Sequence, residues 1–201
     1  MPQKQKIILA SKSPYRAQLL SAAGLKFEIH PASIDERFIE TSLLDSDLDV
    51  EDVADVLAQT KAVSISEEFP EAWVIGSDQT LTLDGQLLHK PENMEEARRR
   101  LLLLSGKSHQ LNSAVALARG GKIVWHHTDK ATITFRALTP EFIGRHLANV
   151  GKVALTSVGA YQIEGEGIQL FEHIEGEYFS IMGLPLIALL KQLRQLEIID
   201  G

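Results

Sequence analysis

Short apolar runs that suit buried strands alternate along this chain with longer amphipathic segments that suit helices. The runs from Ile7 to Ala10 and from Trp73 to Ile75 are continuously apolar, which is typical of buried strands. Helices are expected from Pro14 and from Pro140 to about Asn149, since proline fits the first helical turn. Glu92 to Leu104 is strongly amphipathic. Because strands and helices interleave, the sequence predicts an α/β fold with a mixed central β-sheet flanked by helices.

Glycine-containing turns indicate two hairpins. Asp84-Gly85 lies between two short apolar pieces, and Asp-Gly is a favoured two-residue hairpin turn. Gly120-Gly121 separates the longer runs Ser113 to Ala118 and Ile123 to Phe135, which predict a second hairpin of long strands. Gly159 to Phe171 is interrupted by glycines and is expected to mix loop and strand.

The remaining segments complete the predicted order. A second strand around Phe27 to Ile29 is followed by a polar loop through Asp35 and Glu36. The acidic run Asp45 to Asp52 is expected to open a helix that continues to Lys61, because carboxylates are favourable at a helix N-terminus. Pro185 to Leu193 predicts a last helix.

No linker, low-complexity segment or repeat divides the chain, so residues 1–201 are predicted to form one domain. With 201 residues and 44% hydrophobic content, the chain can bury one substantial core. Its longest apolar stretches, Leu101 to Leu104 and Leu184 to Leu190, are far shorter than the roughly 20 residues that span a bilayer. The N-terminal region lacks the apolar core of a signal peptide. We therefore expect a cytoplasmic protein that does not bind a membrane.

Charge and cysteine content exclude several classes of function. The formal net charge is -7, which argues against binding a nucleic-acid polymer, since that requires clustered Lys and Arg. A small polyphosphate can still bind if a few cations line one cleft. The chain has no cysteine, so disulfides, thiolate metal sites and cysteine nucleophiles are excluded.

Two local patterns could carry chemistry. Ser11-Lys12-Ser13-Pro14-Tyr15-Arg16 lies at a predicted strand-to-helix turn, where backbone N–H groups attract anions and an arginine can bind phosphate. The alternative is a simple helix cap. Gly76-Ser77-Asp78-Gln79 is expected at the end of a strand, where Asp78 could hold a metal or accept a proton from water. The alternative is an aspartate that caps a loop.

Other candidate residues are informative only when they are considered together with the motifs above. Glu36, Lys61 and Lys90 would each ordinarily be solvated surface residues. The glycine-rich stretch Gly159 to Gly167 could approach a ligand closely, or could be only a tight turn. His126-His127 is not expected to bind one metal, because adjacent side chains on a strand point to opposite faces.

Taken in order, these segments resemble the Maf-like nucleotide pyrophosphatase family. The family pattern contains L-A-S-x-S-P-R-R, D-E, K-A, S-D-Q or a related triplet, K-P, L-S-G-x-x-H, A-G-x-Y-x-I-Q-G and G-L-P-L. Eight segments of this sequence match it, from about Ile7 to about Leu193: Leu9 to Arg16, Asp35-Glu36, Lys61-Ala62, Ser77 to Gln79, Lys90-Pro91, Leu104 to Gly106 with His109, Gly159 to Gly165, and Gly183 to Leu186. Each segment is weakly specific, but eight in the right order are specific as a set.

The resemblance implies two lobes around a cleft, as in inosine triphosphate pyrophosphatases, and a hydrolase that acts on an acid anhydride. It implies water attack on a nucleoside triphosphate, which gives the monophosphate and pyrophosphate. Asp78 would be the catalytic residue, and Glu36 with Asp78 would hold a divalent cation, Mg²⁺ or Mn²⁺. Ser11, Arg16, Lys61 and Lys90 would neutralise the phosphates. The resemblance also makes a homodimer possible.

Three departures from the family pattern indicate which nucleotide base the substrate carries. The first Arg of the motif pair is Tyr15, and the positions often held by Thr and Gln are Gln79 and Glu164. This set is similar to the branch that hydrolyses 7-methyl-GTP to 7-methyl-GMP in the removal of modified nucleotides, although that branch usually has Trp at the first position. An aromatic face and a carboxylate suit a cationic methylated guanine. His89 replaces a usual Gly, and Asn112-Ser113 replaces a usual Thr-Gly.

Two alternatives remain at this point. The protein could be a pyrophosphatase of the dTTP/UTP type, because most of the motifs are shared with that branch. It could also be a non-catalytic protein that senses nucleotides or regulates cell division, because one Arg of the phosphate motif is missing.

Overall fold

The computed structural model describes residues 5–44, without the side chain at position 44, and residues 49–200. Its strands form one seven-stranded sheet in the order β2-β1-β3-β5-β6-β7, with β4 paired to β3. The strands are β1 Ile7–Leu9, β2 Glu28–Ile29, β3 Trp73–Leu83, β4 Gln86–Leu88, β5 Ser108–Arg119, β6 Lys122–Phe135 and β7 Phe171–Glu175. The α-helices are α1 Pro14–Ala22, α2 Glu36–Leu44, α3 Val53–Glu68, α4 Met94–Leu104, α5 Pro140–Val150, α6 Tyr178–Ile181 and α7 Leu186–Gln195. Short 3₁₀ helices are η1 Val50–Asp52, η2 Gly151–Thr156 and η3 Glu166–Leu170.

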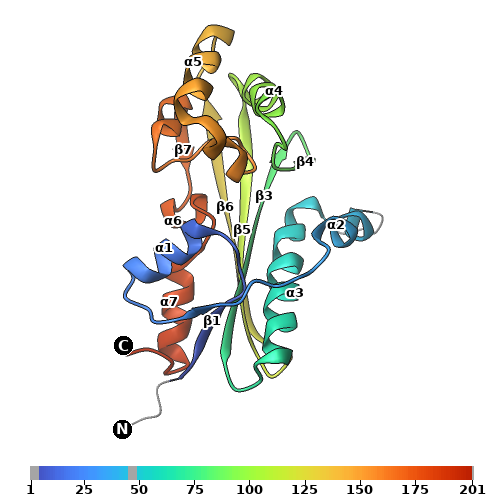
Figure 1. Ribbon diagram of the computed structural model, residues 1–201, viewed down its shortest axis with the longest axis vertical. Helices are drawn as coiled ribbons and strands as arrows, with labels where there is room; N and C mark the ends of the chain where they lie inside the picture. Colours follow the sequence, from blue (N-terminus) through green and yellow to red (C-terminus); the bar gives the residue numbers. More distant parts are fainter. Residues whose placement is uncertain (1–4, 45–48, 201) are drawn as a thin grey trace.

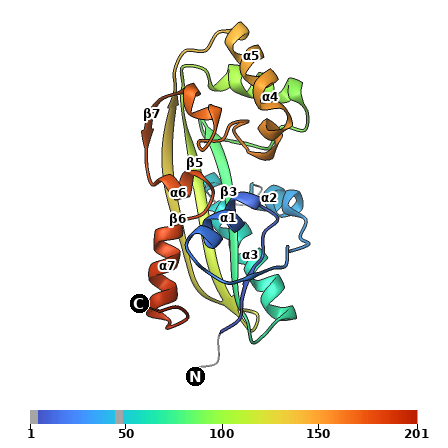
Figure 2. The same cartoon turned by 60° about the vertical axis from the view of Figure 1, so that its left-hand side comes forward.

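The long strands β3, β5 and β6 run the length of the molecule and carry helices at both ends (Figure 1). In the lower part, α3 covers one face of the sheet, while α1 and α7 cover the other. In the upper part, α4 and α5 pack together over a separate group of buried side chains. Figure 2 shows that these two helices lie apart from α1, α2 and α3. The prediction of a mixed sheet flanked by helices in two lobes is therefore confirmed. No helix within the described residues is long and apolar enough to cross a membrane.

Side chains of β3 point alternately to the two faces of the sheet and therefore contact different helices. Val74 packs with Ile65 of α3, whereas Ile75 packs with the core of α1 and α7. Because successive side chains of a strand point to opposite faces, Asp78 shares the face of Val74, and Gln79 shares the face of Ile75. Asp78 and Gln79, although adjacent in the sequence, therefore contact different parts of the chain.

Helix α3 packs closely against the sheet through small residues. Ala54, Ala58 and Ala62 of the helix face three alanines of β5, and all six are fully buried. Gly76 of β3 completes this contact, since a Cβ atom there would lie 2.1 Å from the carbonyl oxygen of Ala58. Small residues on both sides therefore fix how near α3, and any side chain that it carries, can approach β3.

Both predicted hairpins are confirmed. β3 and β4 are joined by Asp84 at φ 51° and Gly85 at φ 77°, the positive values that the favoured hairpin turn requires. β5 and β6 are joined at Gly120-Gly121, and both glycines also have positive φ. The predicted first strand and the helices at Pro14, Glu92, Pro140 and Pro185 agree with the structure to within a few residues.

Three predictions need correction. The strand that starts at Trp73 does not end at Gly76 to Asp78 but continues to Leu83, because β5 pairs with it throughout this stretch. Glu36 does not lie in a loop, since it is the first residue of α2. Gly159 to Leu170 contains no strand, and β7 begins only at Phe171.

The acidic run that was predicted to open a helix is only partly described. Asp45 to Leu48 lies outside the described residues. Asp49 begins the described part, and its side chain accepts a hydrogen bond from the backbone N–H of Glu51, which caps η1. The α-helix itself starts at Val53.

Candidate functional site

A pocket opens beside an unpaired stretch of a sheet strand. β1 pairs with Trp73–Ile75 of β3, and β4 pairs with Leu81–Leu83 on the same side. Between these pairings, no strand in the described parts of the chain joins residues 76–80 on that side. The pocket has a volume of about 630 Å³. All nine predicted site residues line it: Ser11, Tyr15, Arg16, Glu36, Lys61, Asp78, Gln79, Lys90 and Glu164.

The first motif both caps a helix and forms a wall of the pocket. The Ser13 side chain accepts a hydrogen bond from the Arg16 backbone N–H, and Pro14 is the first helical residue. The Arg16 guanidinium donates to Ser11 Oγ at 3.0 Å, to the Ser77 carbonyl at 2.7 Å and to the Gly183 carbonyl at 2.8 Å. Burial lowers the pKa of this arginine. Arg16 therefore joins three separate segments in addition to placing a cation in the pocket.

A buried ion pair lies at the centre of the predicted chemistry. The Lys61 ammonium lies 2.5 Å from Asp78 Oδ1 and 2.7 Å from Glu36 Oε1. The side chains of Lys61 and Asp78 are 9% and 12% exposed. Burial alone would raise the pKa of Glu36, but the hydrogen bond and charge of Lys61 outweigh it and lower that pKa. The close approach of α3 to β3 thus holds an ammonium between two carboxylates.

Sequence reasoning missed a third carboxylate. Glu40 lies one turn after Glu36 on α2, lines the same pocket, and its side chain is 14% exposed. Burial raises its pKa, the charges of Asp78 and Glu36 raise it further, and His89 opposes them from 3.4 Å. The signal for Glu40 was its four-residue spacing from Glu36, which places both on one helix face. It could not be used while this segment was interpreted as a loop.

Lys90 supplies another cation at an exposed position of the pocket. Partial loss of hydration lowers its pKa, and the positive charge of Arg16 lowers it further. Asp78 and Glu36 act in the opposite direction. The carboxylates and the other cations of the pocket therefore act in opposite directions on the charge of Lys90.

The three predicted specificity residues have different surroundings. The Tyr15 hydroxyl lies 3.5 Å from Thr156 Oγ1, and Glu164 is an exposed residue that lines the same pocket. Gln79 donates from Nε2 to Ser113 Oγ and to the carbonyls of Ser180 and Ile181.

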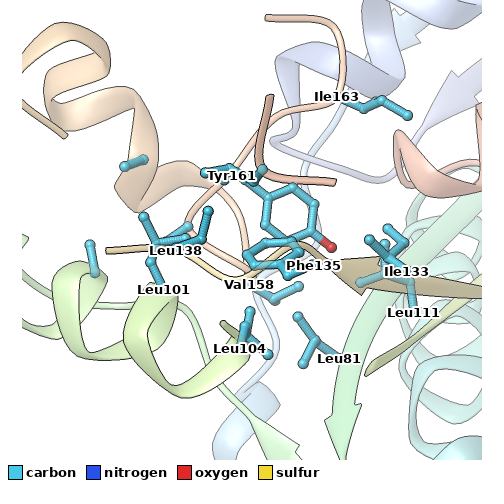
Figure 3. Close-up of a cluster of buried hydrophobic side chains, with 14 of the residues drawn as sticks. Leu81, Leu101, Leu104, Leu111, Ile133, Phe135, Leu138, Val158, Tyr161 and Ile163 are labelled. Carbon is cyan, nitrogen blue, oxygen red and sulfur yellow. The ribbon is translucent and has the colours of Figure 1, made fainter. Parts of the chain in front are cut away.

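The segment that carries Glu164 is anchored by an aromatic side chain. Figure 3 shows Tyr161 next to Phe135 within the upper core, and their ring centroids are 5.3 Å apart. The Tyr161 hydroxyl lies 2.7 Å from His109 Nε2, and burial lowers the pKa of His109 to about 4. Gly159 is required beside them, since a Cβ atom there would lie 2.1 Å from the Tyr161 ring. His109 and Tyr161, two members of the sequence motifs, therefore hold the pocket wall in place.

The two predicted metal ligands, Glu36 and Asp78, both offer carboxylate oxygens to the pocket. Among the described residues, no group of three or more His, Asp or Glu side chains could hold a metal ion. Glu36 and Asp78 share the Lys61 ammonium and are the two predicted ligands that the structure brings together. His126 contacts Asp55 and His127 contacts Asp129, so the two histidines have separate partners.

A protein-family model described as "Maf-like protein" matches residues 6–196. This chain belongs to the Maf-like family. Among Maf-like relatives, a protein of Mesorhizobium japonicum named "7-methyl-GTP pyrophosphatase" is 60% identical over 98% of this chain and 99% of that protein. Proteins with the same name from Brucella abortus and Bartonella quintana are 56% and 51% identical, over 98% and 96% of both chains respectively.

A solved structure is more distantly similar to this Maf-like chain. The nucleoside-triphosphatase, or dITP/XTP pyrophosphatase, of Mycobacterium abscessus is 16% identical, covers 94% of this chain and 100% of its own, and has a TM-score of 0.41. The family assignment therefore stands on the sequence relatives and on the eight matched motifs, seven of which contribute residues to one pocket.

Proposed function

We propose that this Maf-like protein hydrolyses 7-methyl-GTP to 7-methyl-GMP and pyrophosphate. One structural observation carries the enzymatic part: a buried Lys61 ammonium 2.5 Å from Asp78, in a pocket that Arg16 and Lys90 also line. The names of relatives that are 51–60% identical along nearly their full lengths support the substrate.

The cations of the pocket bind the triphosphate. Arg16, Lys61 and Lys90, with the hydroxyl of Ser11, neutralise phosphate oxygens and the charge that develops as the bond between the α- and β-phosphates breaks. Asp78 accepts the proton of the attacking water or orients that water. Lys61 holds the Asp78 carboxylate in place through the 2.5 Å contact.

Glu36 and Asp78 fit a divalent cation of the Mg²⁺ or Mn²⁺ type. Both supply carboxylate oxygen, and such cations are commonly held by one or two carboxylates together with substrate phosphates. Two protein ligands are therefore enough only when the triphosphate is bound. When bound, the cation would offset negative charge on the phosphates.

A substrate screen tests the reaction. The protein is incubated with 7-methyl-GTP, GTP, dTTP and UTP, each with Mg²⁺ or Mn²⁺, and both pyrophosphate and inorganic phosphate are measured. Release of pyrophosphate with preference for 7-methyl-GTP is expected. Release of inorganic phosphate would contradict the cleavage site, preference for dTTP or UTP would support the other branch, and tight binding without turnover would support a nucleotide sensor.

Glu164→Gln is expected to lower kcat/KM for 7-methyl-GTP about tenfold to a hundredfold, since a charged hydrogen bond contributes about 1.5–3 kcal/mol. The change removes the negative charge that suits a cationic base and keeps the size of the side chain. Activity on UTP is not expected to fall in parallel. Glu166→Gln, at an exposed position outside the pocket, is the matched control. Equal losses on both substrates in Glu164→Gln would mean that Glu164 does not contact the base.

The lowered pKa of Lys90 predicts an early alkaline loss of activity. Because this pKa lies below that of an ordinary lysine, Lys90 loses its charge as pH rises through the lowered value, and phosphate binding weakens. Lys90→Arg should move the alkaline fall of kcat/KM to higher pH, since arginine stays charged. The measurement is a pH profile of kcat/KM, with Lys152→Arg, an exposed position outside the pocket, as control. Identical profiles for wild type and Lys90→Arg would remove Lys90 from phosphate binding.

A further inference from the structure

The amide nitrogen of Gln79 is enclosed by hydrogen-bond acceptors. Nε2 lies 2.9 Å from Ser113 Oγ, 3.0 Å from the Ser180 carbonyl and 3.0 Å from the Ile181 carbonyl. Ser113 Oγ in turn donates to the Ser180 carbonyl at 2.6 Å. The hydroxyl proton of Ser113 is thus already used, and its oxygen faces Gln79 as an acceptor.

This arrangement decides which end of the amide enters the pocket. Two backbone carbonyls can only accept, and Ser113 has no second proton to donate. With the amide reversed, Oε1 would face three oxygen lone pairs without a hydrogen between them. Oε1 is therefore held on the other side, close to Gly183, where an added Cβ atom would lie 3.7 Å from it and 3.6 Å from Arg16 Nε.

Ser113 contacts a residue of the pocket wall but does not line the pocket itself. Its side chain is 1% exposed, and it is absent from the residues that line the pocket, whereas Gln79 is among them. The sequence has serine here where the family pattern usually has glycine, which has no hydroxyl to offer. One of the three acceptors around the Gln79 amide nitrogen is thus a residue that departs from the family pattern.

We infer that Ser113 is a positioning residue for base selection, which locks Gln79 so that the pocket presents a hydrogen-bond acceptor to the base. This rests on the proposed function, since the N1–H and N2–H₂ edge of guanine supplies matching donors. A base carbonyl at the same place, such as that of uracil or thymine, would bring its oxygen against Gln79 Oε1, and the two acceptors would repel each other. The locked amide therefore favours guanine by attraction and disfavours pyrimidine carbonyls by repulsion.

The lock itself can be measured without any substrate. In a ¹⁵N-labelled protein, the Gln79 side-chain NH₂ protons should exchange slowly with solvent in the wild type. They should exchange at least severalfold faster in Ser113→Ala, because one of the three acceptors is removed. Ser113→Thr keeps the hydroxyl and should restore slow exchange. Ser108→Ala, the same substitution on the same strand with its hydroxyl bonded to Thr134, is the control and should leave Gln79 unchanged.

The consequence for selection is measured by kinetics on 7-methyl-GTP and UTP. Ser113→Ala should raise KM for 7-methyl-GTP about three- to tenfold, the size of one neutral hydrogen bond, with kcat nearly unchanged. KM for UTP should stay constant or fall, and Ser113→Thr should restore the wild-type ratio. If the Ser113→Gly protein is more stable than the Ser113→Ala protein, it can be used in its place, since glycine also lacks the hydroxyl.

Two results would overturn the inference: unchanged exchange of the Gln79 amide protons in a folded Ser113→Ala protein, or equal KM changes on both triphosphates. If no triphosphate is hydrolysed even by the wild type, the proposed function fails, while the exchange experiment still decides whether Ser113 locks Gln79.

Discussion

Asp78→Asn is expected to lower kcat by about 10²–10⁴-fold, the usual size of the loss when a general base is removed. Asparagine has almost the same shape but cannot accept a proton from water. Lys61 loses its 2.5 Å contact with a charged carboxylate but keeps Glu36 at 2.7 Å, so the ammonium stays paired. Pyrophosphate release under saturating substrate measures the loss, and circular dichroism with a thermal melt shows whether the fold is kept.

Asp84→Asn is the matched control for this variant. Asp84 is exposed in the turn that follows the same strand, and asparagine tolerates its positive φ. It should leave kcat within about twofold, as expected for a surface change away from the site. Near-wild-type turnover in a folded Asp78→Asn protein would show that Asp78 neither accepts the proton nor orients the water.

Gly76→Ala is expected to lower the free energy of unfolding by about 3 kcal/mol or more, at the upper end for overpacked cores. The new methyl group would lie 2.1 Å from the Ala58 carbonyl oxygen and 2.7 Å from the Ala62 backbone nitrogen. Both contacts are with the backbone of α3, so no side-chain rotation can relieve them and the helix must move. Since α3 carries Lys61, the movement should also separate the ammonium from Asp78 and lower kcat.

Urea denaturation measures the first effect, and Gly144→Ala is its control. Gly144 lies within α5, and an added Cβ would meet nothing within 4 Å. That substitution should stabilise the protein by up to about 1 kcal/mol, because alanine favours helix over glycine. An unchanged unfolding midpoint in Gly76→Ala would contradict the argument that small residues set the distance between α3 and the sheet.

Sequence patterns predicted those elements whose local signals agree with the final fold. The hairpin turns at Asp84-Gly85 and Gly120-Gly121 and the proline-started helices needed no tertiary information, and the structure confirms them. The nine site residues were predicted mainly through the ordered motifs of the family, and all nine line one pocket. Their catalytic, metal-binding and specificity roles stay predictions until the variants are measured, as does the assignment of residues 1–201 to one domain.

Long-range contacts explain what the sequence did not reveal. Gly76-Ser77-Asp78 has the composition of a strand end, but pairing with β5 continues the strand through it, and the glycine serves the contact with α3. The Ser113 hydroxyl donates to the carbonyl of Ser180, 67 residues further along the chain, and the two groups meet only in the folded protein. Glu40 was hidden because Asp35 and Glu36 were interpreted as a polar loop, whereas the Asp35 side chain accepts a hydrogen bond from the Phe38 backbone N–H and caps α2.

The stretch of β3 left open between β1 and β4 has a consequence for solubility. An unpaired strand edge offers backbone groups to any other extended chain, and such edges promote intermolecular pairing and aggregation. Here the Arg16 guanidinium donates to the Ser77 carbonyl on that edge, and the charges of Lys61, Asp78 and Lys90 surround it. A neighbouring strand could add itself only by stripping water from these charges. The charged groups to which we assign polyphosphate binding therefore also disfavour the addition of another strand at this edge.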